Sequence, residues 1–111
     1  LKLGEALSEV LDPEHSLIVA STDMSHYISA RAARTQDEYA ISAVKAMDPS
    51  ALVRNVAAHG VSMCGVMPTA ATLEAARRMG ATKSALVDYR NSGDVTGDPS
   101  QVVSYAAFVL T

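Results

Sequence analysis

The chain has 111 residues, of which 49% are hydrophobic and 19% charged, and its formal net charge is −3. This length predicts one domain, 1–111, and the low charged fraction excludes a disordered chain. The acidic balance argues against nucleic-acid binding, and the longest nearly apolar runs, Leu17–Ala20 and Tyr105–Leu110, are far shorter than the roughly 20 residues of a membrane span.

The first part of the chain predicts a helix followed by a buried strand. Residues Leu1–Leu11 carry apolar side chains at helical spacing, and Asp12-Pro13 ends the helix because the residue before proline avoids the α region. The run Ser16–Ser21 is apolar without alternation. Such a run predicts a strand that is buried on both faces, as in a parallel sheet.

Three helices follow in the middle of the chain. The first is predicted after residues 22–30, with the spacing of a capping box at Thr35 and Glu38. Asp48-Pro49 predicts the start of the second, and Gly60 its end. Pro68 opens the third, which Gly80 closes.

The last part of the chain predicts two strands, Ala85–Tyr89 and Gln101–Leu110, joined by a loop over residues 91–99. Helices that alternate with buried strands indicate an α/β architecture. Three strands are few for a stable sheet, and the chain starts abruptly inside a helix. We therefore expect a fragment whose sheet is completed by a missing N-terminal half or by a second chain, which includes a homo-oligomer.

The first candidate site follows the predicted strand Ser16–Ser21. Asp23 and His26 lie three residues apart, and a carboxylate beside an imidazole fixes its tautomer and tunes its basicity for acid/base work. Alternatively, Asp23 caps a turn and His26 lies half exposed at the surface. The spacing alone favours the turn.

The second candidate is Cys64, the only cysteine in the chain. It precedes a predicted helix, whose N-terminal amides would favour the thiolate that binds metals. The alternative is a buried cysteine that acts as a small hydrophobe, which is the more common case. A single thiol cannot form an internal disulfide and suits the reducing cytoplasm, where we expect the protein to be located.

A third segment follows the strand Ala85–Tyr89. Arg90 and the backbone amides around Ser92 are candidates for binding an acidic group, although a solvated surface charge is the more common role for such an arginine. In open α/β sheets, ligands bind at the carboxyl ends of the strands. The three segments are therefore predicted to meet at one crevice.

Four motifs in series resemble the C-terminal part of Memo family proteins, over almost the whole chain. They are Ser-Thr-Asp-Met-Ser-His-Tyr at 21–27, Ser-Met-Cys-Gly-Val-Met-Pro at 62–68, Tyr-Arg-Asn-Ser-Gly-Asp-Val-Thr-Gly-Asp at 89–98 and Val-Ser-Tyr-Ala-Ala at 103–107. The resemblance implies an α/β/α layered fold similar to the class III extradiol dioxygenases, which use non-haem iron(II).

The resemblance also implies site roles. Cys64 matches the cysteine of the family's metal pocket, and Asp23 and His26 match a conserved pair in which the histidine acts as acid/base. The family pocket also carries two histidines from the N-terminal half, which have no counterpart in this chain. The cofactor implied is iron or copper.

Two functions follow as expectations. The first is a metal-dependent, dioxygenase-like redox protein acting on a small molecule, with Cys64 as ligand and His26 as acid/base oriented by Asp23. The second is a non-catalytic module that binds a peptide or anion in the same pocket.

Overall fold

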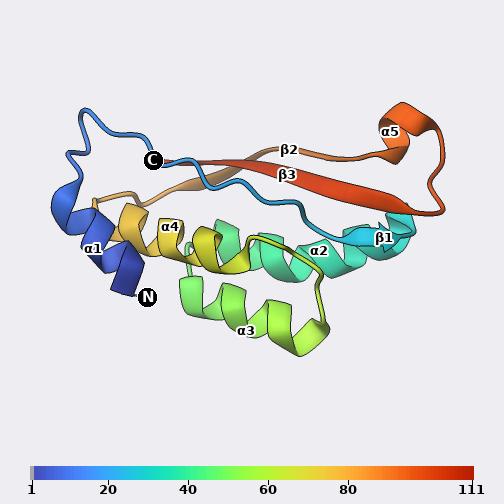
Figure 1. Ribbon diagram of the computed structural model, residues 1–111, viewed down its shortest axis with the longest axis horizontal. Coiled ribbons are helices and arrows are strands. Elements are labelled where there is room, and N and C mark those ends of the chain that lie inside the picture. The colour runs from blue at the N-terminus through green and yellow to red at the C-terminus, as the bar shows by residue number, and fades with distance from the viewer. Residues whose placement is uncertain (1) are drawn as a thin grey trace.

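The computed structural model describes residues 2–111 and places a three-stranded sheet against a layer of helices (Figure 1). This confirms the α/β class. Leu1, the first residue of the predicted helix Leu1–Leu11, lies outside the described residues. In chain order the elements are α1 (Lys2–Val10), β1 (His26–Ile28), α2 (Ala30–Lys45), α3 (Pro49–His59), α4 (Val66–Arg78), β2 (Ser84–Asn91), α5 (Gly93–Thr96) and β3 (Val102–Leu110).

The sheet has the order β1-β3-β2, and both strand pairs are antiparallel. The expectation of a parallel sheet is therefore wrong for the described residues. The long pair β2–β3 is amphipathic, because alternate side chains of a strand point to opposite faces. Its inner face packs against the helices (Figure 1), through Leu86, Tyr89, Ala106, Phe108 and Leu110.

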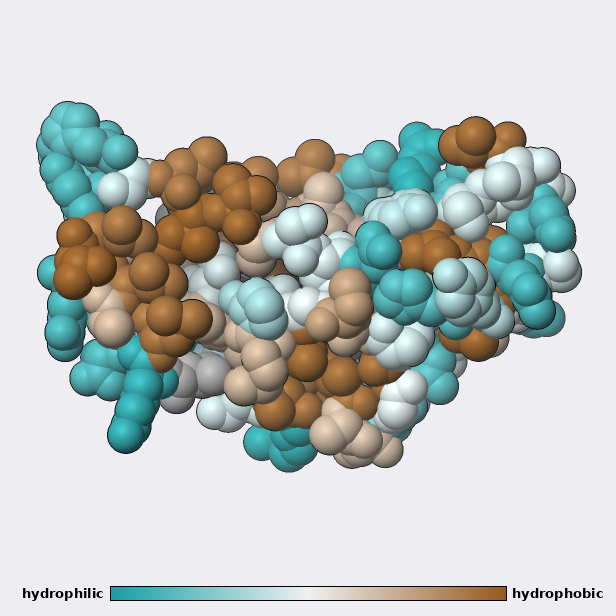
Figure 2. Space-filling model, in the orientation of Figure 1, coloured by the Kyte–Doolittle hydropathy of each residue, from teal (hydrophilic) through white to brown (hydrophobic). Residues whose placement is uncertain are grey.

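The outer face of the sheet has no covering layer within residues 2–111. Val87 is 63% exposed and Val109 is 51% exposed. Figure 2 shows hydrophobic side chains at the surface along the sheet-bearing side of the molecule. The described chain thus provides two of the three layers expected for an α/β/α fold.

The predicted strand Ser16–Ser21 is wrong. The segment has no assigned secondary structure, and Leu17 and Val19 are 87% and 76% exposed. An apolar run becomes a buried strand only when neighbouring strands pair with it, and no strand of the described residues pairs with this segment. The first strand is instead the short β1, which starts at His26, within the stretch that we expected to be irregular.

The helices agree with their predicted positions better than with their predicted starts. α3 has Asp48 as N-cap and Pro49 in its first turn, and it ends at Gly60 in the left-handed region, as expected. The capping box at Thr35 and Glu38 is wrong, because α2 begins at Ala30 and Ser29 caps it. Favourable helix-forming residues before Thr35 extend the helix towards its N-terminus.

The core lies between the sheet and the helices α2, α3 and α4, which Figure 1 shows on one side of β2 and β3. α4 starts at Val66, two residues before the expected Pro68, and the loop predicted after β2 contains the helical turn α5. No helix among residues 2–111 is both long and apolar enough to cross a membrane. Buried hydrophobic residues of the main cluster are Met24, Ala40, Ile41, Ala43, Val44, Leu52, Val56, Val61, Met63, Ala70 and Leu73.

Candidate functional site

The site forms where two segments about forty residues apart in the chain cross: residues 22–26, which lead into β1, and residues 62–65, which lead into α4. The Gly65 amide donates to Thr22 Oγ1 at 2.8 Å. A Cβ added at Gly65 would lie 2.6 Å from Thr22 Cβ and 3.0 Å from the Ser21 carbonyl oxygen. Only glycine therefore lets the two backbones approach this closely.

Asp23, His26 and Cys64 come together at this crossing. Each offers one potential ligand atom, and these atoms all lie within 4.8 Å of one another. Asp23 and His26 are partly buried, whereas Cys64 is exposed. Two of the three segments that were predicted to meet at one crevice therefore do meet, and the chemical roles of these three residues stay predictions.

Ser62 fixes the orientation and tautomer of the His26 imidazole. The Ser62 carbonyl oxygen lies 2.7 Å from His26 Nδ1, and the Ser62 hydroxyl accepts the His26 backbone amide at 2.8 Å. Because a carbonyl oxygen only accepts, Nδ1 must carry the proton. In the neutral ring Nε2 then presents a lone pair, and it lies 3.6 Å from Asp23 Oδ2. The tautomer is therefore set by Ser62, whereas we expected Asp23 to set it.

The Cys64 thiol is held in an environment that favours its thiolate. The Asp23 backbone amide donates to Sγ at 3.4 Å, and Thr22 Oγ1 lies 3.6 Å from it. These hydrogen bonds, that of Asp23 first, lower the pKa of the Cys64 thiol below its ordinary value. The alternative of a buried, purely hydrophobic cysteine is wrong. The donor that matters most is the Asp23 amide, where we expected the amides at the start of the following helix.

Tyr27, the residue after His26, lies in the left-handed region with φ of 57°. It stands between the pairs His26–Val103 and Ile28–Val102, where the register of β1 against β3 shifts. A bulge of this kind re-aims neighbouring side chains. The imidazole therefore leaves the strand at a point of local backbone strain.

A buried carboxylate that the sequence analysis missed lies behind this site. Asp37 of α2 is fully buried, and its Oδ1 accepts the Ser25 amide at 3.0 Å and the Ser25 hydroxyl at 2.6 Å. Its Oδ2 accepts the Tyr89 and Ser104 hydroxyls. Burial and the hydrogen bond to Asp37 raise the pKa of the Tyr89 phenol well above its ordinary value. The sequence did carry a signal for Asp37: it lies four residues before Ile41, on the same buried face of α2, where a charged residue is unusual.

Arg90 and Ser92 do not join the three clustered residues. β1 pairs with one edge of β3, and β2, which leads to Ser92, pairs with the other. The Ser92 hydroxyl accepts the Val103 amide at 3.0 Å, so it closes the turn after β2. Arg90 Nε lies 3.3 Å from both Asp88 carboxylate oxygens and lines a different pocket, shared with Arg31 and Arg34 of α2.

Comparison with known proteins assigns the chain to a family. A family model described as Memo-like protein matches residues 1–109. The chain is 47% identical over 107 residues to a MEMO1 family protein of Aquifex aeolicus, covering 96% of this chain and 40% of that protein. It is 43% identical over 111 residues to MEMO1 family protein MK0963 of Methanopyrus kandleri, covering 98% of this chain and 39% of that protein. The chain thus spans about two fifths of the length of these relatives.

Proposed function

Because this chain belongs to the Memo-like protein family, we propose that Asp23, His26 and Cys64 form part of a transition-metal site in a dioxygenase-like redox protein. The observation that supports the proposal best is the grouping of a thiol sulfur, an imidazole nitrogen and a carboxylate oxygen within 4.8 Å. With Nδ1 protonated, all three atoms are electron-pair donors in the thiolate form. Such atoms repel one another unless a proton or a metal ion lies between them.

The donor set fits iron or copper. Thiolate ligands select soft or borderline metals, and imidazole suits both iron and copper. The hydrogen bond from His26 Nδ1 to the Ser62 carbonyl oxygen leaves Nε2 beside the thiol with its lone pair available for proton transfer. Cys64 Sγ is the proposed ligand, and a bound iron or copper ion would supply redox chemistry at this crossing.

Within this proposal His26 acts as the acid/base. Its Nε2 carries the lone pair that would accept a substrate proton, while Ser62 keeps the ring from rotating. Asp23 Oδ2, at 3.6 Å, stabilises the imidazolium that results from proton uptake. Because the carboxylate faces Nε2, it also limits the directions from which a substrate hydroxyl can approach the ring.

The proposal is tested by loading the protein anaerobically with iron(II) or copper(I), followed by dialysis and elemental analysis. We expect Cys64→Ser to lose metal, and His26→Ala to retain metal but lose oxygen uptake with catechols. His15→Ala is the matched control, because His15 contacts Asp12 at the same three-residue spacing but has no cysteine beside it. A parent protein that stays metal-free after loading contradicts the proposal. Loss of metal in His26→Ala would make His26 a ligand.

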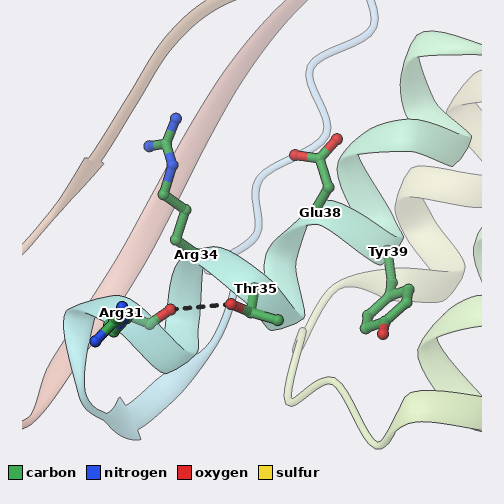
Figure 3. Close-up of a pocket in the computed structure, with 5 residues that line it drawn as sticks. All are labelled: Arg31, Arg34, Thr35, Glu38 and Tyr39. Carbon is green, nitrogen blue, oxygen red and sulfur yellow. Dashed lines mark hydrogen bonds between the residues drawn. The ribbon is translucent and has the colours of Figure 1, made fainter.

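A second candidate function, non-catalytic binding of an acidic peptide or anion, is favoured by three arginines. Arg31 and Arg34 lie in the first turns of α2 (Figure 3), and Arg90 of β2 lines a pocket with them. Asp88 and Asp94 line the same pocket and weaken its positive charge. Calorimetric titration with a phosphotyrosine peptide tests this function. Binding that Arg90→Ala abolishes, without oxygen uptake by the parent, would favour it over the redox function.

We also propose that further polypeptide of the Memo-like domain covers the open face of the sheet and completes an α/β/α fold. The exposed Val87 and Val109 support this, together with the greater length of the relatives. We also propose a cytoplasmic location, because a chain with a single cysteine and no internal disulfide suits a reducing compartment. Sedimentation of the protein alone, and with the remaining domain added, tests the covering. Self-association that Val87→Lys abolishes would instead assign the face to a second copy.

A further inference from the structure

We propose that Asp37 is a positioning residue, which sets the geometry of the Asp23–His26 pair by holding the intervening Ser25 against helix α2. This inference rests on the proposed function only for its consequence in acid/base work at His26. The placement of His26 by Asp37 is a separate claim that is measured without metal.

The Asp37 carboxylate is fully buried, and each of its oxygens accepts two hydrogen bonds. Oδ1 takes both donors of Ser25, and Oδ2 takes the hydroxyls of Tyr89 and Ser104. Within residues 2–111 no Lys or Arg forms an ion pair with it. Removing a carboxylate from water is unfavourable, and a well-packed apolar side chain at such a position is often as stable or more so. Packing alone therefore does not explain an aspartate here.

The hydrogen bonds of Asp37 act on the short segment between the two site residues. Ser25 is 1% exposed and Met24 2% exposed, so both are anchored inward. On its other side the segment is fixed to β3, since Met24 donates to the Ser104 carbonyl oxygen at 2.9 Å and Ser25 accepts the Ser104 amide at 3.0 Å. Asp23 directly precedes this anchored pair in the chain and His26 directly follows it, and both are only partly buried.

Asp37 thus links four parts of the chain at one point: α2, on which it lies, the entry to β1, β2 and β3. A displacement of Ser25 would move the backbone of Asp23 and of His26 together. The 3.6 Å separation of Asp23 Oδ2 and His26 Nε2, and the contact of His26 with Ser62, both depend on that backbone. The two oxygens of Asp37 differ in this respect, because only Oδ1 contacts Ser25 directly.

The test compares Asp37→Asn with Tyr89→Phe in the metal-free protein. Nitrogen-15 NMR of the His26 ring at about pH 8.5, above the ordinary imidazole pKa of about 6.5, reports its tautomer. We expect the parent and Tyr89→Phe to show the Nδ1–H form, because Tyr89 bonds only Oδ2. Asp37→Asn should give a mixture of tautomers, since the ring then leaves the Ser62 carbonyl. A merely structural Asp37 would lower stability in both variants and leave the ring signals unchanged, which would overturn the inference.

Two further measurements keep the outcome decisive. If Asp37→Asn fails to fold, Ser25→Ala replaces it, because this variant removes one donor to Oδ1 and retains the buried carboxylate. A smaller shift of the same ring signals is expected, and unchanged signals would overturn the inference. Cobalt(II) titration of the folded proteins tests metal binding separately. Because Cys64 is the proposed ligand and His26 acts as acid/base, we expect the parent, Asp37→Asn and Tyr89→Phe to bind cobalt with similar affinity. A loss confined to Asp37→Asn would make His26 a ligand. A parent that binds no cobalt would refute the proposed function and leave the placement of His26 standing.

Discussion

Replacing Gly65 by alanine tests the close approach on which the whole site depends. The added Cβ would lie 2.6 Å from Thr22 Cβ and 2.8 Å from Thr22 Oγ1. Thr22 Cβ is bonded to the backbone, so a χ1 rotation can move Oγ1 but cannot relieve the contact with Cβ. Because φ of Gly65 is −105°, alanine meets no backbone penalty, and the effect isolates the steric contact.

The expected loss of stability is about 2 kcal/mol. Overpacking in a well-packed region costs about 1–3 kcal/mol, and loss of the hydrogen bond from the Gly65 amide to Thr22 Oγ1 costs about 1 kcal/mol. Alanine also restricts the unfolded chain, which offsets about 0.4–1 kcal/mol of this. For a domain of this size the corresponding fall in Tm is about 10 °C.

Urea denaturation followed by far-ultraviolet circular dichroism measures this change as a lower midpoint with an unchanged slope. Gly60→Ala is a useful control, because a Cβ there meets nothing within 4 Å and only the positive φ of 62° opposes it. Thr22→Gly in the Gly65→Ala background should recover part of the loss, since it removes both contacting atoms. Loss of less than about 0.5 kcal/mol in Gly65→Ala, or strict additivity in the double variant, would refute the close approach of the two segments.

Three other substitutions have distinct expected outcomes. Cys64→Ser should change the free energy of unfolding by less than about 0.5 kcal/mol, because the side chain is exposed, and a large loss in urea denaturation would show that the thiol belongs to the core. Tyr89→Phe should lower stability at neutral pH. Since the pKa of Tyr89 is raised in the folded state, its contribution is complete below pH of about 10 and declines above it, so the difference between the two proteins should be constant up to about pH 10 and shrink as the pH rises further. Tyr27→Gly should leave thermal stability unchanged or raise it, because the tyrosine is 73% exposed and its left-handed conformation costs of order 1 kcal/mol; a marked fall in Tm would show that the ring makes stabilising contacts.

Local signals predicted the helices and the long strands, because the interactions that specify them lie within a few residues. Asp48, Pro49 and Gly60 define α3 through capping and backbone geometry alone. The N-cap of α2 was also readable, since Ser29 precedes a run of good helix formers, but the spacing of Thr35 and Glu38 matched a familiar motif further along. The sequence therefore offered two N-caps for the same helix, Ser29 and Thr35. Only the structure, in which α2 begins at Ala30, shows that Ser29 is the cap.

The wrong strand at Ser16–Ser21 has a different cause. A continuous apolar run indicates that a segment is stabilised by burial. It does not indicate whether a neighbouring strand is present to bury it. Leu17 and Val19 are exposed in the described chain, and their apolar character remains unexplained by contacts within residues 2–111. For the same reason the direction of the strands could not be inferred, because it depends on pairing partners.

The convergence of Asp23, His26 and Cys64 was predictable, whereas the groups that orient them were not. Ser62 acts on His26 through its backbone carbonyl oxygen, which is common to every residue and carries no sequence signature. Asp37 does carry a signal, since a charge on the buried face of an amphipathic helix requires partners. Those partners come from the entry to β1, from β2 and from β3, and no spacing along the chain indicates them.

The proposed metal site lies at a crossing of two segments, so metal binding there would be coupled to folding. Cys64 comes from residues 62–65, and Asp23 and His26 come from residues 22–26, so an ion held by both segments binds the native arrangement and not the extended chain. At a free metal concentration a hundred times the Kd, such an ion stabilises the fold by about 2.7 kcal/mol. An ion held by Asp23 and His26 alone would join two side chains only three positions apart in the sequence. Such an ion could also bind the unfolded chain, so it would stabilise the fold less. The metal-induced rise in Tm, compared between the parent and Cys64→Ser, therefore separates coordination across the crossing from adventitious binding to one segment.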